Sequence, residues 1–195
     1  MVEQTTRNQI LEAATAVFAK KGFTKASMND IMQAAGVSKG GIYWHFSSKD
    51  EIIATIFQQY FEAQLSNLDT MLGIDGKASD KMTRLARAAS SDIEAFSDQF
   101  PSSLEFYELA SKNEELRAEM ETFFLAYRQH IELLAQQAIA DGDWVALPPS
   151  EIANTILSIF EGTLLLASVF PDHMNMSTQM ETAMNLLLNG LRNSS

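Results

Sequence analysis

Apolar side chains recur at helical spacing along most of the chain. In residues 6–21, 49–72 and 113–140 they lie three and four positions apart, which places them on one face of a helix. Turn-forming residues separate further segments of the same kind. The additional helices that we expect lie at residues 79–96, 101–111, 150–170 and 177–191. No segment shows convincing strand alternation, so the pattern predicts an all-α fold.

Residues 27–49, with the sequence SMNDIMQAAGVSKGGIYWHFSSK, contain two short predicted helices joined by a tight turn. Ser27 and Asp30 form a weak capping-box signature at the start of the first helix. Gly36 ends that helix, because glycine tolerates the left-handed conformation found at helix ends. Ser38 is a favourable N-cap for the second helix. The segment is typical of a helix-turn-helix.

The second of these helices, residues 39–46, has two contrasting faces. Ile42 and Phe46 are four positions apart and are expected to point inward. The outer face is basic, aromatic and glycine-bearing, and it carries Lys39, Gly40, Tyr43, Trp44 and His45. A helix with this outer face suits docking in a DNA major groove.

A fuller capping box, formed by Ser48 and Glu51, marks the start of the next helix. Lys49 lies in the first turn of that helix, where free backbone N–H groups can bind a phosphate. We therefore expect Lys49 to contact the DNA backbone.

At these residues the chain resembles the tetracycline-repressor (TetR) family of one-component regulators. The resemblance is carried by ILEAATAVFAKKGFTKAS, residues 10–27, and IMQAAGVSKGGIYWHFSSKDEI, residues 31–52, and it extends over about residues 5–55. It implies a three-helix DNA-binding head at residues 1–50. Residues 51–195 are then expected to form a larger helical body that binds a ligand and forms a dimer.

The resemblance also implies roles for single residues. Lys39 matches a position that contacts a base edge or a phosphate, and a lysine can pair with guanine O6 and N7. Trp44 matches a position against the sugar–phosphate backbone or a thymine methyl group, although it can also pack across the domain surface. The complete set of expected DNA-binding residues is Thr24, Ser27, Ser38, Lys39, Gly40, Gly41, Tyr43, Trp44, His45 and Lys49.

Gly41 departs from the pattern of many TetR-family members, which carry a polar or larger side chain at this position. Without that side chain, base readout is expected to depend on Lys39, Trp44 and the shape of the DNA. Gly40 lets the backbone approach the DNA closely.

The distribution of charge agrees with a DNA-binding head. The whole chain has a net charge of −11, which by itself disfavours binding to DNA. Residues 1–50, however, contain six basic and four acidic side chains, whereas the remainder contains eight basic and twenty-one acidic ones. A mildly basic head is therefore attached to a strongly acidic body, which predicts modest, salt-dependent non-specific DNA binding.

Other classes of function find little support. The sequence contains no cysteine, its three histidines are scattered, and it has no zinc-protease, nucleophile-elbow or P-loop motif. We expect no enzyme activity, cofactor or metal. The N-terminus lacks a signal pattern, and the most apolar stretch, residues 156–170, is interrupted by Glu161 and is short for a membrane span. A cytoplasmic location without membrane attachment is the expectation.

The body is rich in aromatic residues from successive helices. One interpretation is an ordinary aromatic core, and the other is a cavity for an apolar or aromatic small molecule. Glu161 interrupts an apolar run, so its carboxylate can pair with a cationic ligand or with Arg128, or reach solvent at a helix edge. The candidate ligand-binding residues are Phe61, Phe96, Phe100, Phe106, Tyr107, Phe123, Phe124, Tyr127 and Glu161.

The last two predicted helices carry many apolar side chains. These side chains either fill the core of one protomer or form a dimer face in which two helices from each chain make a four-helix bundle. A two-fold dimer would place its two recognition helices, the helix at residues 39–46 of each protomer, about 34 Å or a multiple of it apart on a palindromic site. The candidate interface residues are Ile152, Ile156, Ile159, Gly162, Leu166, Met184, Leu187, Leu188 and Leu191.

The function that the resemblance implies is a ligand-responsive, sequence-specific DNA-binding transcriptional regulator. We expect a repressor that a small apolar or aromatic effector releases from a palindromic operator, by moving the helix at residues 49–72 and changing the separation of the heads. Two alternatives stay open: a helical small-molecule-binding dimer without DNA-binding activity, and an activator of the same fold.

Overall fold

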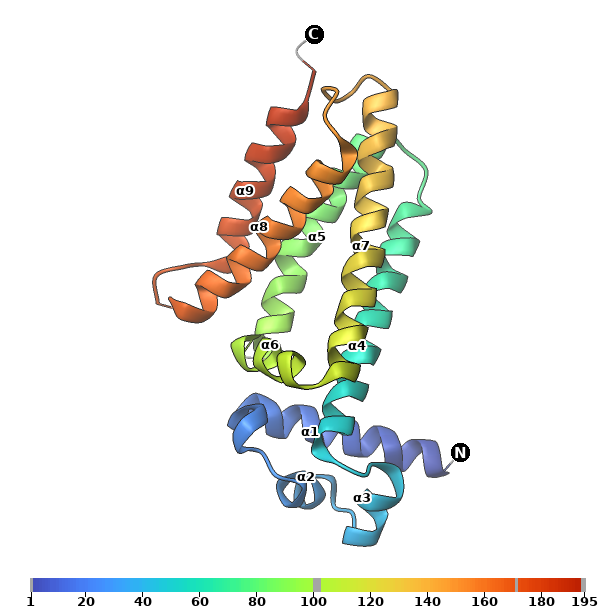
Figure 1. The fold of residues 1–195 in the computed structure, drawn as a ribbon, viewed down its shortest axis with the longest axis vertical. Helices are drawn as coiled ribbons and strands as arrows, with labels where there is room; N and C mark the ends of the chain where they lie inside the picture. Colours follow the sequence, from blue (N-terminus) through green and yellow to red (C-terminus); the bar gives the residue numbers. More distant parts are fainter. Residues whose placement is uncertain (1, 100–102, 171, 194–195) are drawn as a thin grey trace. The chain divides into compact units, whose positions relative to one another are not determined.

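The computed structural model describes the backbone of residues 2–99, 103–170 and 172–193, and the side chains of residues 5–88, 104–170 and 172–193. These residues form helices and no strand; a single isolated bridge joins Trp144 and Arg192. The predicted all-α fold, with a helix-turn-helix at its N-terminal end, is confirmed (Figure 1).

The helices follow one another with short connections. Their bounds are α1 Val2–Lys25, α2 Met28–Ala35, α3 Lys39–His45, α4 Lys49–Leu72, α5 Ala78–Gln99, α6 Ser103–Lys112, α7 Glu114–Ala140, α8 Pro149–Val169 and α9 Met176–Leu191. The bounds predicted for α4 agree at both ends. The other predicted helices differ by a few residues at their ends, where a repeating apolar pattern carries the least information.

Helix α1 is interrupted near its C-terminal end. Gly22 has φ 76° and ψ 166°, values outside the helical region, before helical backbone resumes up to Lys25. A positive φ of this size disfavours residues with a side chain, so glycine suits this position. The helix predicted at residues 6–21 is therefore followed by a kink at Gly22, after which the chain turns toward α2.

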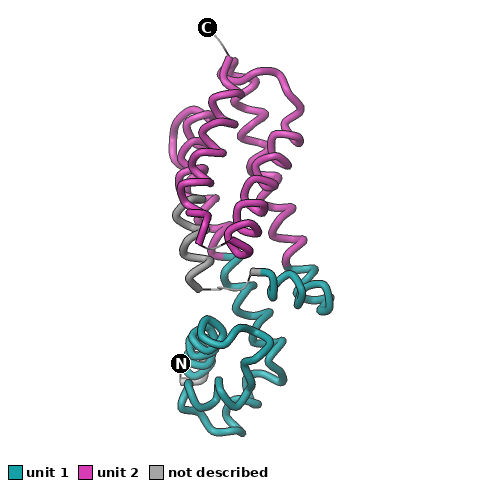
Figure 2. The backbone as a smooth tube through the Cα atoms, turned by 90° about the vertical axis from the view of Figure 1, so that its left-hand side faces the viewer, with its two compact units in different colours: residues 1–62, 96–119 teal, residues 63–95, 120–195 magenta. Residues whose placement is uncertain are grey.

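Two compact units divide the chain (Figure 2). Unit 1 comprises residues 1–62 and 96–119, and unit 2 comprises residues 63–95 and 120–195. The units do not follow the division at residue 50 that the sequence suggests, because the start of α4 and the whole of α6 pack with the N-terminal helices. The assignment of DNA binding to residues 1–50, and of ligand binding and dimerisation to residues 51–195, stays a prediction.

The interior of unit 1 is aromatic. The rings of Phe57 and Phe106 are stacked with centroids 3.8 Å apart, and Phe23 and Phe61 lie beside Phe57. All four side chains are buried. Phe61 and Phe106, which we predicted to line a ligand cavity, are therefore buried among aromatic side chains of α1, α4 and α6, and their part in ligand binding stays a prediction.

The remaining ligand-binding candidates lie in different places. Tyr107 is on α6 in unit 1, whereas Phe123, Phe124, Tyr127 and Glu161 are half-buried residues of unit 2. Phe123 contacts the rings of both Phe124 and Tyr127. Phe96 and Phe100 were also predicted to bind the ligand. The side chain of Phe96 and the whole of Phe100 lie outside the part of the chain that the structure describes. The predicted set is thus divided between the two units.

Helices α8 and α9 pack against each other in unit 2, and most of the predicted dimer residues lie between them. Five of these residues, Ile152, Ile156, Met184, Leu188 and Leu191, are buried within the single chain. These five side chains therefore contribute to the core of the protomer, and a contact of any of them with a partner stays a prediction.

The other predicted dimer residues remain accessible. Ile159, Gly162 and Leu187 are half-buried, and Leu166 is exposed. The structure adds exposed apolar side chains that the sequence did not distinguish from core residues: Leu165, Val169, Phe170 and Leu186. Helix α8 is also long and apolar enough to cross a membrane, judged by length and composition alone. A third of its 18-residue apolar stretch is buried. The apolar stretch that the sequence expectation concerned, residues 156–170, begins within this helix and is shorter than the helix.

Candidate nucleic-acid interface

Reciprocal hydrogen bonds cap the start of α2. The Ser27 Oγ accepts from the Asp30 N–H at 3.2 Å, and the Asp30 Oδ2 accepts from the Ser27 N–H at 3.0 Å. The predicted capping box is thus present. At the other end Gly36 adopts φ 64° and ψ 27°, the left-handed conformation that we expected to end the helix.

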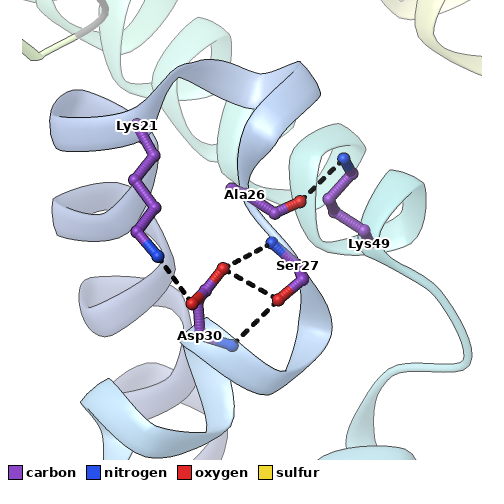
Figure 3. Close-up of polar contacts among 5 residues, drawn as sticks. All are labelled: Lys21, Ala26, Ser27, Asp30 and Lys49. Carbon is purple, nitrogen blue, oxygen red and sulfur yellow. Dashed lines mark hydrogen bonds and ion pairs between the residues drawn. The ribbon is translucent and has the colours of Figure 1, made fainter.

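Asp30 also binds a lysine of α1 (Figure 3). The Lys21 Nζ donates to the Asp30 Oδ1 at 2.6 Å, so one carboxylate connects the kink region of α1 with the first turn of α2. The hydrogen bond from Lys21, followed by those from Ser27, lowers the pKa of Asp30 from 3.8 to about 2. The charged form of Asp30 is therefore the form that holds the two helices together.

Ser38 caps α3 as predicted. Its Oγ accepts from the Gly41 N–H at 3.1 Å. A methyl group added at Gly41 would lie 3.3 Å from that Oγ and 3.8 Å from the side chain of Val37, whereas one added at Gly40 would meet no atom within 4 Å. Gly41 therefore faces the cap of its own helix. The position from which a side chain could extend freely is Gly40, in contrast to our expectation for Gly41.

The exposed face of α3 carries two large aromatic side chains. Trp44 is 76% exposed and Tyr43 is 48% exposed, beside the exposed residues Lys39 and Gly40. Ile42 and Phe46 are buried, as predicted from their spacing. Because aromatic side chains of this size are normally covered in a soluble protein, their exposure on a short, capped helix makes this face a candidate binding surface. His45 is half-buried at the end of the same helix.

Lys49, which we predicted to contact a phosphate, makes hydrogen bonds within the protein, and the phosphate contact stays a prediction. Its Nζ donates to the carbonyl oxygens of Phe23, Thr24 and Ala26 at 2.7, 3.4 and 3.0 Å, and the bond to Ala26 is drawn in Figure 3. An ammonium group has three donors, and three carbonyl groups already surround this one. The structure therefore places Lys49 as a support for the end of α1 and its connection to α2.

The predicted capping box at the start of α4 is shifted by one residue. Ser48 Oγ accepts from the Glu51 N–H at 3.1 Å, as expected. The Glu51 carboxylate, however, accepts from the N–H and the hydroxyl of Ser47, both at 2.7 Å. These hydrogen bonds lower the pKa of Glu51. Ser27 and Ser38 likewise use their hydroxyl oxygens as caps, which leaves phosphate contacts at these residues as an additional expectation.

Glu105 of α6 is a functional candidate that the sequence did not indicate. Its Oε2 accepts from the Phe23 N–H at 2.7 Å and from the Thr24 N–H at 3.3 Å. A methyl group added at Gly22 would lie 2.9 Å from the same oxygen. Gly22 thus provides both the backbone turn and the space for the carboxylate. No sequence pattern could have revealed this contact, because the partners are more than eighty residues apart.

Comparisons with known proteins agree with this geometry. Residues 10–56 match the family model described as bacterial regulatory proteins, tetR family. The chain is 27% identical to the uncharacterized HTH-type transcriptional regulator YfiR of Bacillus subtilis over 165 residues, which are 84% of this chain and 80% of YfiR. It is 42% identical to the HTH-type transcriptional regulator TtgR of Pseudomonas putida over 59 residues, which are 30% of this chain and 28% of TtgR.

A solved structure shares the fold over the whole chain. It is that of a candidate transcriptional regulator from Saccharomonospora viridis in complex with choline, with a TM-score of 0.88 and 16% identity, covering 98% of this chain and 100% of that chain. The relatives quoted are regulators and not enzymes. The family model covers the capped helix-turn-helix described above. The chain therefore belongs to the TetR family of bacterial regulatory proteins and is a DNA-binding transcriptional regulator.

Proposed function

We propose that this protein is a cytoplasmic, homodimeric repressor that a small-molecule effector releases from a palindromic operator. The observation that carries the DNA-binding part is the exposed face of α3, where Lys39, Tyr43 and Trp44 extend from a helix whose start is capped and whose inner side is buried. A rigid helix with an exposed basic and aromatic face can enter a major groove without rearrangement.

The surface for DNA has two parts in this proposal. Lys39 and Trp44 contact bases or the sugar–phosphate backbone, and Tyr43 and His45 contact phosphates. Thr24, Ser27 and Ser38 add contacts from the helix starts, and Gly40 allows close approach of the backbone. Lys49 acts indirectly, by supporting the segment from which Thr24 and Ser27 extend.

A gel-shift titration with the protein's own promoter fragment tests the proposal. We expect Tyr43→Ala and Lys39→Ala to weaken binding by about tenfold each, since a lost phosphate or base contact costs about 1–3 kcal/mol. Lys112→Ala on α6 removes the same charge as Lys39→Ala from an exposed position and serves as the control. Full binding by both α3 variants, with unchanged circular dichroism, would falsify the placement of the interface.

The dimer face in this proposal lies on α8 and α9, at the accessible residues and not at the buried ones. Gly162 has open space around it, and Leu166, Val169 and Leu186 are exposed on the same two helices. Apolar side chains exposed in one protomer can be covered by a partner. A two-fold dimer also matches the requirement of a palindromic site for two recognition helices.

The effector is proposed to bind in unit 2 and to act on the head through continuous helices. Helix α4 runs without interruption from residue 49 in unit 1 to residue 72 in unit 2, and α6 is joined to α5 and α7 of the same chain. Both α4 and α6 hold the C-terminal end of α1, through Lys49 and Glu105. An effector that favours another position of either helix would therefore change how the head is held.

Two alternative functions can each be distinguished from the proposed repressor by experiment. A helical small-molecule-binding dimer without DNA-binding activity would leave the promoter fragment unshifted at low salt. An activator of the same fold would bind the fragment and raise transcription from it. The exposed set on α3 favours DNA binding over the first alternative.

A further inference from the structure

Helix α3 has little buried surface of its own. Of its seven residues only Ile42 is buried, and Phe46, the residue at its C-cap, adds a second buried apolar side chain. A helix of two turns is marginal by itself, and side chains that read a ligand must be held to within about 0.5 Å of their working position. The orientation of α3 must therefore be set by the segments on either side of it.

Gln9 of α1 holds the chain before α3. Its Nε2 donates to the carbonyl oxygen of Ala35, the last residue of α2, at 2.7 Å. The last carbonyl groups of a helix have no partner within the helix. Those of Met32 and Gln33 accept from the backbone of the turn that follows, whereas that of Ala35 accepts from a side chain of another helix. Gln9 thus fixes the end of α2 against α1.

Arg7 of α1 holds the chain after α3. Its guanidinium carbon lies 5.0 Å from the centroid of the Phe46 ring. A planar guanidinium over an aromatic ring adds a cation–π attraction to this contact. The pKa of Glu51 on α4 is lowered by the hydrogen bonds from Ser47 and also by the positive charge of Arg7. Arg7 therefore connects α1 with the end of α3 and the start of α4.

Helix α1 is a rigid reference for both contacts. Its buried side chains Ile10, Leu11 and Ala14 fix it in the interior of unit 1, directly after Arg7 and Gln9. A contact at one end of a short helix leaves the helix free to pivot, whereas contacts at both ends restrict its tilt and rotation.

We propose that Arg7 and Gln9 are positioning residues for DNA recognition, which hold the two ends of α3 at the orientation in which its exposed face enters the major groove. Neither residue contacts DNA itself in this inference. The inference rests on the proposed function, in which α3 is the helix that reads the operator.

The first test compares specific with non-specific DNA binding. Fluorescence anisotropy is measured with the protein's own promoter fragment and with a random fragment of the same length, over a range of salt concentrations. We expect Arg7→Met and Gln9→Leu each to weaken binding to the promoter fragment by about fivefold to tenfold. Binding to the random fragment should change little, because it depends on the charge of the head and not on base contacts.

The salt dependence distinguishes positioning from a direct contact. Loss of a phosphate contact lowers the slope of log K against log salt by about one. We expect both variants to keep the slope of the wild type. Two controls should bind both fragments with nearly the affinity of the wild type. Lys20→Met removes a charge from an exposed position of α1, and Gln58→Leu removes an amide that donates to Glu62 on the exposed side of α4.

The second test needs no DNA. The N–H groups of Ile42 and Phe46 donate to the Ser38 and Ile42 carbonyl groups at 3.0 and 2.9 Å. We expect these two amides to exchange hydrogen faster in Arg7→Met and Gln9→Leu than in the wild type, because α3 is held less firmly. The circular dichroism spectrum should stay that of the wild type, which shows that the variants fold.

Three results would overturn the inference. One is undiminished promoter binding together with wild-type exchange in both variants. Another is an equal loss of affinity for both fragments with a slope lowered by about one, which would make Arg7 a direct phosphate contact. The third is a lower unfolding midpoint with unchanged specificity, which would leave both residues a structural role alone. If the wild type does not bind the promoter fragment, the proposed function fails, and the exchange rates still decide whether these residues hold α3.

Discussion

Three charged side chains, Asp30, Lys49 and Glu105, hold backbone groups around the segment between α1 and α2. Asp30 accepts from the start of α2, Lys49 donates to three carbonyl groups, and Glu105 accepts from two N–H groups. A kinked segment has backbone groups that no helix satisfies, and these groups need partners when they are partly buried. At the scale of single residues, these charged side chains therefore stabilise the backbone conformation of the head.

Lys49→Met should therefore lower the stability of the head and not only its affinity for DNA. Loss of a charged donor to three carbonyl groups is expected to cost about 1–3 kcal/mol. Chemical denaturation followed by circular dichroism measures the change, and Lys39→Met at the exposed start of α3 is the control. Unchanged stability of the Lys49 variant, with weakened DNA binding, would restore the direct phosphate contact that the sequence suggested.

The carboxylate of Asp30 predicts a stability that depends on pH. Its pKa is 3.8 in the absence of partners and about 2 in the folded head, so the folded state favours the charged form. The resulting stabilisation is present above the unfolded pKa and is lost as the pH falls through the folded pKa. Asp30→Asn should reduce the loss of stability between about pH 5 and about pH 2, as measured by urea unfolding.

That pH dependence should not disappear entirely in the Asp30→Asn variant. The pKa of Glu51 is also lowered by hydrogen bonds from Ser47, and the pKa of Asp143 in unit 2 is lowered by Lys77 and Ser79. Identical acid unfolding of the wild type and the variant would show that the Asp30 interactions form equally well in the unfolded chain.

At the scale of helices, α6 is connected to the head by polar and aromatic contacts at neighbouring residues. Glu105 binds the turn after Gly22, and Phe106 stacks on Phe57 of α4. Buried aromatic pairs fix the distance between two helices, and hydrogen bonds from a carboxylate fix the orientation of the turn. A shift of α6 would therefore be transmitted to the turn that precedes α2.

Glu105→Ala should release the N–H groups of Phe23 and Thr24. We expect faster hydrogen exchange at these two amides, because each loses its acceptor. Glu108→Ala lies three residues further along α6, removes the same charge from an exposed position and provides the control. Equal exchange at Phe23 and Thr24 in the wild type and both variants would show that the carboxylate does not stabilise the turn.

At the scale of the whole molecule, the accessible apolar surface of α8 and α9 bears on assembly. Leu166 is 46% exposed and Leu186 is 71% exposed, on helices whose opposite faces form the core of unit 2. Leu166→Arg should shift the protein from dimer to monomer in multi-angle light scattering at micromolar concentration, since a charge would be buried at the interface. Ile74→Arg, at an exposed position before α5, should leave the mass unchanged.

A monomeric mass for the wild-type protein at micromolar concentration would contradict the proposed dimer directly. A dimeric mass that persists in the Leu166→Arg variant would place the interface on another part of the surface. Either result would also change the expected spacing of the two recognition helices on DNA.

The sequence by itself determined the helices, the caps of α2 and α3, and the family. These features depend on contacts between residues three or four positions apart, so spacing alone reveals them. The burial of Ile42 and Phe46 agrees with the prediction from their spacing. So do the capping hydrogen bonds of Ser27, Asp30 and Ser38. The positions and contacts of these residues could be predicted without knowing how distant segments pack.

The tertiary structure alone decided which apolar residues of α8 and α9 are core and which are accessible, and what Lys49 and Glu105 bind. Ile156 and Leu166 are equally apolar in the sequence, yet one is buried and the other exposed. Glu105 and Phe23 meet only because α6 packs beside α1. Burial and long-range hydrogen bonds depend on which helices become neighbours, and no local spacing records that choice.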